Sequence, residues 1–182
     1  MKKLGKWILI GFLALMAFVY MTNVYDVPWS RKLPAPTPET VTVAPARDPA
    51  PGEFTNYYTK RRAEIGLSLL QQAMPDFSVE MRYDNVNGWL FYDITCPEIS
   101  ADFIRSAQAD YGHCVEDWET IVRSTEDIQS SLQRMFTEQN DETVVVVDIL
   151  NPENPDEVWL SVANGIAGYD VVNGVDLLNG QS

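Results

Sequence analysis

The sequence predicts a small α+β domain, with helices packed on a mostly antiparallel sheet, behind an N-terminal transmembrane helix and a proline-rich tether. Three observations lead to this prediction: an uncharged apolar run near the N-terminus, prolines crowded into the segment after it, and a C-terminal region whose apolar residues recur with helical and strand periods in turn. The predicted order within the domain is helix, strand, strand, helix, helix, strand, strand, with room for one more C-terminal strand.

The apolar run covers residues 7–25 and carries no charged side chain, whereas Lys2, Lys3 and Lys6 come before it. As a helix, this run would span about 28 Å at roughly 1.5 Å per residue, close to the ~30 Å apolar thickness of a bilayer. Because positive charge favours the cytoplasmic side, residues 1–6 are expected inside and the chain after Asp26 outside. We therefore predict a single-pass signal anchor in the cell membrane, held in the lipid bilayer through residues 7–25.

A cleaved secretory signal is the alternative for this run. Such signals have a shorter apolar core and small residues two positions apart before the cleavage site. Here Ala14 and Ala17 are three positions apart, and the bulky Val19, Tyr20 and Met21 follow. These features favour an uncleaved anchor, and either interpretation exports the rest of the chain.

Residues 26–53 are predicted to be an extended, disordered tether. Seven of the 11 prolines lie in it, among small and polar residues: Pro28, Pro34, Pro36, Pro38, Pro45, Pro49 and Pro51. A segment of this composition cannot bury enough apolar surface to fold, and as a polyproline-II helix it would reach on the order of 80 Å at ~3.1 Å per residue. The alternating prolines also fit a ligand for a proline-binding module, but we favour a spacer.

The folded domain is predicted over residues 54–182. Residues 55–74 have an apolar helical stripe that ends at Pro75, and apolar residues then alternate strictly over 77–83 as in a half-buried strand. Asn87-Gly88 favours a hairpin turn into a second strand over 89–95.

Two helices are predicted next. Thr95 and Glu98 have the spacing of a capping box, with Pro97 in the first turn of a helix that runs to about Asp110. The helix over residues 115–137 has the clearest apolar stripe in the chain. Its members recur at three- and four-residue steps: Trp118, Ile121, Val122, Thr125, Ile128, Leu132 and Phe136.

Residues 144–150 are β-branched and apolar on both faces, which predicts a central strand that packs on the 115–137 helix. We expect Ile128 and Leu132 to meet Val146 or its neighbour there. On this basis Leu132→Ala should destabilise severely, whereas Gln133→Ala, on the opposite side of the helix, should have almost no effect.

Further strands are predicted over 158–163 and 166–172, joined by Asn164-Gly165. The order helix, strand, turn, strand over residues 57–95 is repeated over 115–163. The repeat is one of order and not of residues, so it suggests an internal duplication without establishing one, and it predicts helices packed on one face of an antiparallel or mixed sheet.

The charge of the domain is strongly negative. After Tyr83 the chain carries 19 acidic residues and three basic ones, Arg105, Arg123 and Arg134. Such a surface repels phosphate backbones, so we expect no nucleic-acid partner. A basic partner or a divalent cation would fit the charge, although high like charge also serves simply to keep an exported domain soluble.

Cys96 and Cys114 are the two cysteines of the chain and lie 18 positions apart. Outside the membrane a disulfide between them is chemically allowed, and closing a loop of this length would stabilise by roughly 3 kcal/mol in the chain-entropy model. We predict this disulfide, because both positions fall at segment ends and not in the expected core. Two buried thiols are the alternative.

No other motif predicts a catalytic, cofactor or metal site. His113 beside Cys114 lacks the paired spacing of a zinc site, and the oxygen-rich stretch from Asp148 to Glu157 lacks the glycine and distal glutamate of a calcium loop. Lys60, Arg61 and Arg62 form a basic cluster near a helix start, which fits either a solvated helix face or contact with an acidic partner.

The leading hypothesis is a membrane-tethered, extracytoplasmic binding or assembly module of the bacterial cell envelope, without catalytic activity or a cofactor. Its partner would be a protein or another envelope component. The alternative is an envelope hydrolase that works through paired carboxylates. A raised-pKa carboxyl facing a second acid in a pocket would favour the hydrolase, and a flat apolar or aromatic patch would favour the module.

Overall fold

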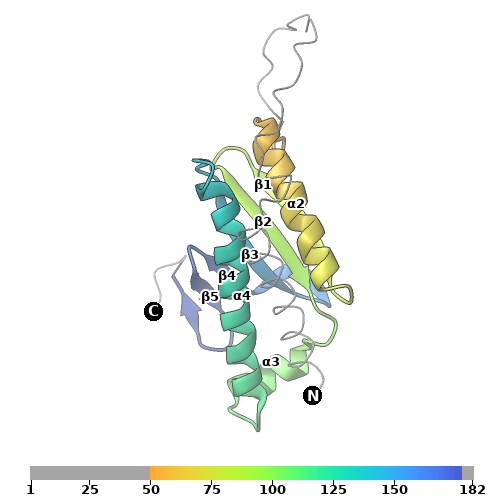
Figure 1. Cartoon of the computed structure of the whole chain (residues 1–182). Coiled ribbons are helices and arrows are strands. Elements are labelled where there is room, and N and C mark those ends of the chain that lie inside the picture. The colour runs from red at the N-terminus through yellow and green to blue at the C-terminus, as the bar shows by residue number, and fades with distance from the viewer. Residues whose placement is uncertain (1–49, 178–182) are drawn as a thin grey trace, which may run out of the picture.

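The computed structural model describes residues 50–177, which form three helices and a six-stranded sheet (Figure 1). The helices are α2 (Tyr57–Ala73), α3 (Ala101–Gln108) and α4 (Cys114–Thr137). The strands are β1 (Ser78–Asp84), β2 (Trp89–Thr95), β3 (Val144–Asn151), β4 (Asn154–Ala163), β5 (Ile166–Asp170) and β6 (Val175–Asp176). The predicted α+β class and mostly antiparallel sheet are confirmed. The predicted N-terminal segments 1–6 and 7–25 lie outside the described residues, as does the tether up to residue 49.

The strands lie in sequence order, from β1 to β6, and every neighbouring pair is antiparallel except β2 and β3. The parallel pair runs from Trp89 opposite Val144 to Thr95 opposite Leu150. A parallel pair needs a crossover between its strands, and α3 and α4 provide it. The predicted repeat of helix, strand and strand is therefore present in the fold as α2-β1-β2 beside α4-β3-β4.

The helix starts follow side-chain caps. Asn56 precedes α2, and its Oδ1 accepts hydrogen bonds from the amides of Tyr58 and Thr59. For α3 the capping box predicted at Thr95 is wrong, because Thr95 stays paired to Leu150 in the sheet and the helix begins after Ser100, whose hydroxyl accepts from the Phe103 amide at 3.2 Å.

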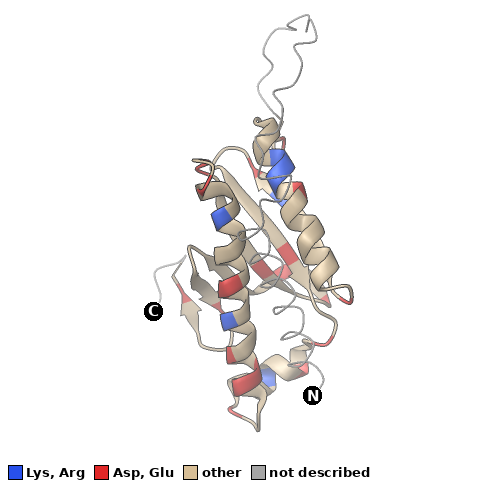
Figure 2. Cartoon of the chain, viewed as in Figure 1, with Lys and Arg blue, Asp and Glu red and all other residues tan. Residues whose placement is uncertain are grey.

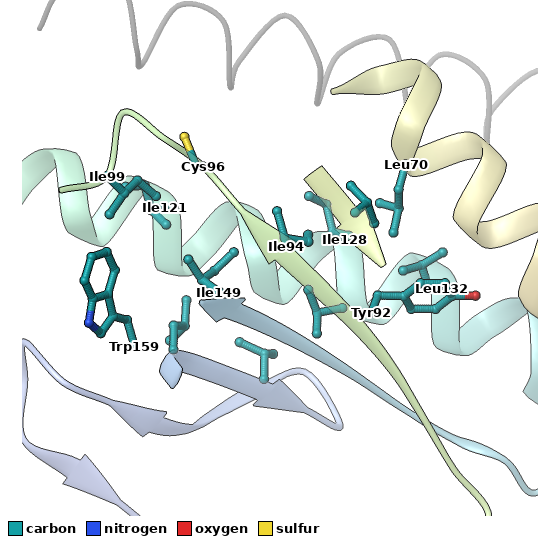
Figure 3. Packing of buried hydrophobic residues seen from close by; sticks show 14 of the residues in the cluster. Leu70, Tyr92, Ile94, Cys96, Ile99, Ile121, Ile128, Leu132, Ile149 and Trp159 are labelled. Carbon is teal, nitrogen blue, oxygen red and sulfur yellow. The ribbon is translucent and has the colours of Figure 1, made fainter. Parts of the chain in front are cut away.

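The core lies between the sheet and its helices. Figure 1 shows α2 and α4 over the same face of the sheet, and on that face the alternate residues of β2 and β3 are buried: Leu90, Tyr92, Ile94, Val145, Val147 and Ile149. Ile128 and Leu132 of α4 belong to the same cluster (Figure 3). The predicted packing of this helix on this strand is confirmed, with Val145 and Val147, the neighbours of Val146, on the helix side.

Two glutamines of α4 bond directly to the sheet. Gln133 donates from Nε2 to the Thr143 carbonyl at 2.9 Å and accepts from the Val145 amide at 2.8 Å. Gln129, fully buried, donates to the Val145 carbonyl and accepts from the Gly165 amide at 2.7 Å. The prediction that Gln133 lies on the side of the helix away from the core is therefore wrong.

The chain enters the domain at one end of β1. Phe54 stacks on Tyr83 with ring centroids 4.3 Å apart and planes 9° apart, and both rings pack against the core cluster. Asn85, just after the strand, accepts from the Gly52 amide at 3.4 Å and donates to the Ala50 carbonyl at 3.1 Å. Because Tyr83 pairs with the buried Leu90, the chain joins the domain on the helix-covered side of the sheet.

Within residues 50–177 no helix is both long and apolar enough to cross a bilayer. The run predicted to do so, residues 7–25, is not among the described residues.

Candidate functional site

A row of polar residues crosses the sheet on the face opposite the helices. Its members occupy directly paired positions on five successive strands: Glu80, Asp93, Asp148, Ser161 and Tyr169. The first three are acids, and we call Glu80, Asp93 and Asp148 the acidic row. Figure 2 shows acidic positions on neighbouring central strands. Like charges directly opposite each other destabilise a sheet, so this arrangement needs compensation.

Arg82, from the next outward-facing position of β1, provides part of that compensation. Its guanidinium donates from Nε to Asp93 Oδ2 at 2.6 Å and from one terminal nitrogen to Asp93 Oδ1 at 3.3 Å and Asp148 Oδ2 at 3.0 Å. The same group lies 3.7 Å from the centre of the Phe91 ring, in a cation–π contact. One cation thus serves two carboxylates.

Asp148 is the buried member of the row, with 3% of its surface exposed. Its Oδ1 atom is also buried and accepts no hydrogen bond within the described part of the chain. Burial, and to a lesser extent the charge of Asp93, raise the pKa of Asp148, whereas the Ser161 hydroxyl and Arg82 lower it, and the net result is a pKa of about 6. The carboxyl therefore titrates close to neutral pH.

The oxygen-rich stretch after Asp148 forms a hairpin turn between β3 and β4. Asn151 Oδ1 accepts from the Glu153 amide at 2.8 Å, and its Nδ2 donates to Glu157 at 2.8 Å. His113 is exposed at the start of α4, with Nδ1 3.2 Å from a Glu116 oxygen. Among residues 50–177, no three His, Cys, Asp or Glu side chains gather in an arrangement that would hold a metal ion.

Cys96 and Cys114 are both thiols in the structure, one just after β2 and the other at the first position of α4. The expectation that they lie outside the core is wrong: they are 1% and 8% exposed and belong to one apolar cluster. Burial raises the pKa of the Cys96 thiol, which makes it a poor nucleophile. The predicted disulfide remains a prediction.

The basic cluster at the start of α2 is divided in the fold. Arg61 pairs with Glu64 at 3.4 Å, whereas Arg62 pairs with Asp141 before β3 and lies over the Phe136 ring at 5.7 Å. Arg62 therefore joins helix to sheet and does not belong to a solvated face.

Asp141 is the centre of that junction. Its carboxylate accepts from Thr59 Oγ1 at 2.7 Å, from Arg62, and from both the amide and the hydroxyl of Thr143. Burial by itself would raise the pKa of Asp141, but these hydrogen bonds outweigh it and hold the pKa at about 2.

A shallow depression lies beside α4, on the other layer of the domain from the acidic row. Its lining consists of Gln129, Ser130, Gln133, Arg134, Thr137, Asn164 and Gly165, so it contains no carboxylate. The amides of Gln129 and Gln133 are already bonded to the backbone, as described above. The two glutamines of the lining are therefore already engaged within the domain.

Comparisons with protein-family models, with curated proteins and with solved structures found no match to this chain. The site is thus assessed from its geometry. Sequence reasoning did not single out Arg82 or Asp93, although strict alternation over residues 77–83 places Arg82 on the polar face. The missing information was that β2 lies beside β3, which brings Asp93 next to Asp148.

Proposed function

We propose that this chain is a membrane-tethered, extracytoplasmic binding or assembly module of the bacterial cell envelope, without a catalytic role. The observation that carries the proposal is the one-sided fold: α2, α3 and α4 contribute to one buried core, and no described helix covers the sheet face that bears the acidic row. A sheet face with aromatic and arginine side chains is a common form of protein-binding surface.

The composition of this face supports binding. Trp89 is 39% exposed and lies 6.1 Å from Phe91, ring centre to ring centre. Arg82, beside them, keeps 54% of its side chain exposed. Tryptophan and arginine are the side chains that most often carry binding energy at interfaces.

The position of the tether also supports this role. The chain joins the domain through Phe54 and Tyr83, on the helix-covered side of β1. The point of attachment is therefore on the side of the sheet opposite the acidic row. If residues 7–25 are the anchor and 26–53 the spacer, the domain can present this face at a distance from the bilayer.

The alternative, a hydrolase with paired carboxylates, has one observation in its favour. Asp148, with a raised pKa, faces the second acid Asp93, which is the pairing expected of an acid and a base. Against it, Arg82 bonds to both carboxylates, and the depression described above lies elsewhere. We therefore place the binding role first.

Photo-crosslinking in intact cells tests the binding role. A crosslinking amino acid at Glu80 or Thr95, on the acidic-row face, should give one discrete adduct, whereas the same group at Arg123 or Asp127, exposed on α4, should give none. Adducts from α4 positions alone would overturn the assignment of the face. Hydrolysis of an envelope polymer that disappears in both Asp93→Asn and Asp148→Asn would instead support the enzyme.

Labelling tests the proposed topology. A cysteine introduced at Thr40, in the tether, should react with a membrane-impermeant reagent on intact cells. Reaction only after lysis would place the domain inside and reject an extracytoplasmic role.

A further inference from the structure

We propose that the depression beside α4 is a binding site for a small organic carboxylate, which the Arg134 guanidinium holds. The site is separate from the sheet face to which partner binding is assigned, and it does not depend on that role. Three features of the described residues carry the inference: a rigid floor, an arginine without an acidic partner, and polar side chains on the rim with no other hydrogen bond.

The floor of the depression is rigid because two glutamine side chains are each held at two points. Gln129, which is fully buried, bonds to the Val145 carbonyl and the Gly165 amide. Gln133 bonds to the Thr143 carbonyl and the Val145 amide. Side chains that are already ordered lose no further rotamer freedom when a ligand binds, so this floor lowers the entropic cost of binding.

Arg134 is the one charged residue in the lining, and it makes no ion pair with any other residue from 50 to 177. Glu138 follows it by four positions, a spacing at which helical ion pairs commonly form, yet these two do not pair. The other arginines in this part of the chain are all paired with carboxylates: Arg61, Arg62, Arg82, Arg105 and Arg123. In a chain with a net charge of −13, an unpaired guanidinium in a depression is free to bind a carboxylate from outside.

The rim adds uncharged hydrogen-bonding groups around the guanidinium. Ser130 lies one helical turn before Arg134, and Asn164 comes from the turn between β4 and β5. Neither side chain bonds to another described residue. Gly165 keeps the space between them open, because its φ of 74° favours glycine and a Cβ there would lie 3.2 Å from Ser130 Oγ. A ligand bound to Arg134 can therefore extend hydroxyl or amide groups to this rim.

Volume and charge define the class of ligand. The depression has a volume of about 320 Å³, at the lower end of the ~300–1,000 Å³ of small-molecule sites, so it fits a small molecule. A carboxylate balances the single charge of Arg134. A phosphate group, with a charge of about −1.5 to −2 at pH 7, would leave excess negative charge on a domain that already carries 19 acidic residues after Tyr83. The polar lining favours a carboxylate that also bears hydroxyl or amide groups, as in an acidic sugar or the end of a short peptide.

The test uses the full chain, isotope-labelled for NMR, and two pairs of probes that differ mainly in charge. N-acetyl-alanyl-alanine and its C-terminal amide represent the peptide end, and glucuronate and glucuronamide represent the acidic sugar. At least one carboxylate should shift the amide signals of Ser130, Arg134 and Gly165, with a dissociation constant of about 1–10 mM for a molecule of this size. Its neutral counterpart should bind at least about tenfold more weakly. The tighter of the two carboxylates identifies the source.

Arg134→Gln should weaken binding at least about tenfold, because it removes the charge and keeps a polar side chain. Arg123→Gln is the matched control, the same change on exposed α4 but outside the depression, and should leave binding unchanged. Ser130→Ala removes one rim hydroxyl and should weaken binding roughly two- to fivefold, which keeps the inference testable if Arg134→Gln does not fold.

Three outcomes overturn the inference: no shift with either carboxylate at about 50 mM, equal binding of the neutral counterparts, or equal weakening by Arg123→Gln. Shifts confined to β1 and β2 would place the ligand elsewhere and reject the site as well. Crosslinking from the acidic-row face is a separate measurement, so failure here leaves the proposed binding role standing.

Discussion

Gly66 of α2 lies directly against Tyr92 of β2, so close that a Cβ added to Gly66 would overlap the tyrosine hydroxyl. That hydroxyl is itself fixed, because it donates to the Ala63 carbonyl at 2.9 Å in a fully buried position. The added Cβ would also lie 3.2 Å from Cδ2 of Leu132 on α4. The absence of a side chain at Gly66 therefore sets how closely α2 approaches both the sheet and α4.

Gly66→Ala should destabilise the domain. In an exposed helix interior this change would stabilise by about 1 kcal/mol, but overpacking of a filled site typically costs about 1–3 kcal/mol. Chemical denaturation of the wild type, Gly66→Ala and the double variant Gly66→Ala with Tyr92→Phe measures the effect. Tyr92→Phe removes the hydroxyl that the new Cβ would overlap. Gly66→Ala should therefore cost less stability in the Tyr92→Phe background than in the wild type. A more stable Gly66→Ala protein would show that α2 is not held this closely.

Gln133→Ala should lower the free energy of unfolding by about 1–3 kcal/mol. The Val145 amide and the Thr143 carbonyl would both lose the hydrogen bond that the Gln133 side chain provides. Leu132→Ala should cost about 2–5 kcal/mol through the cavity it leaves. Gln72→Ala, the same change on the exposed face of α2, is the control and should stay within about 0.5 kcal/mol of wild type. Urea midpoints of the three variants rank them, and equal midpoints for Gln133→Ala and Gln72→Ala would contradict the structure.

Asp141 should contribute stability that is lost in acid. Its folded-state pKa of about 2 is below the ordinary value of 3.8, so its contribution is present above about pH 4 and disappears as pH falls towards 2. Asp141→Asn should therefore lower the free energy of unfolding at pH 7 by on the order of 1–2 kcal/mol and make little difference at pH 2. Asp127→Asn serves as the exposed control. A constant difference between Asp141→Asn and wild type from pH 7 to pH 2 would count against this role.

The contribution of Asp148 to stability should have the opposite pH dependence to that of Asp141. Its folded-state pKa of about 6 is above the ordinary value, so the protonated form is favoured by folding. The contribution is fully present below about pH 4 and is lost as pH rises through 6. Between pH 4 and pH 7 the wild type should lose stability relative to Asp148→Asn, measured as free energy of unfolding at each pH. Parallel curves for the two proteins would mean that Asp148 is not desolvated in the fold.

Cys96 and Cys114 should form a disulfide in the exported protein. Mass analysis without reductant should then show a deficit of two hydrogens, and double substitution by serine should lower the melting temperature by more than reduction alone, because both positions are also buried. A full complement of thiols in freshly exported protein would instead establish them as core residues of the reduced domain.

Local patterns were sufficient for most of the elements, but not for the start of α3, the start of β4 at Asn154 or the short strand β6. The apolar stripe from Trp118 to Phe136 and the β-branched run from Val144 depend on periods of about 3.6 and 2 residues, which are properties of neighbouring positions in the chain. The packing of α4 on β3 could also be predicted from the sequence, because these two elements carry the largest continuous apolar surfaces and both must be buried. The Asn87-Gly88 turn is likewise local chemistry.

The amino-acid sequence by itself thus determined the α+β class, the core of α4 and β3, and the excess of acidic charge. Only the tertiary structure decided that β2 lies parallel to β3, which places Asp93 beside Asp148 although 55 positions separate them in the chain. It also decided that Gln133, which is polar and was therefore expected at the surface, accepts a hydrogen bond from the Val145 amide near the start of β3. Strand pairing and buried hydrogen bonds join residues distant in sequence, and local periodicity contains no information on which partners meet.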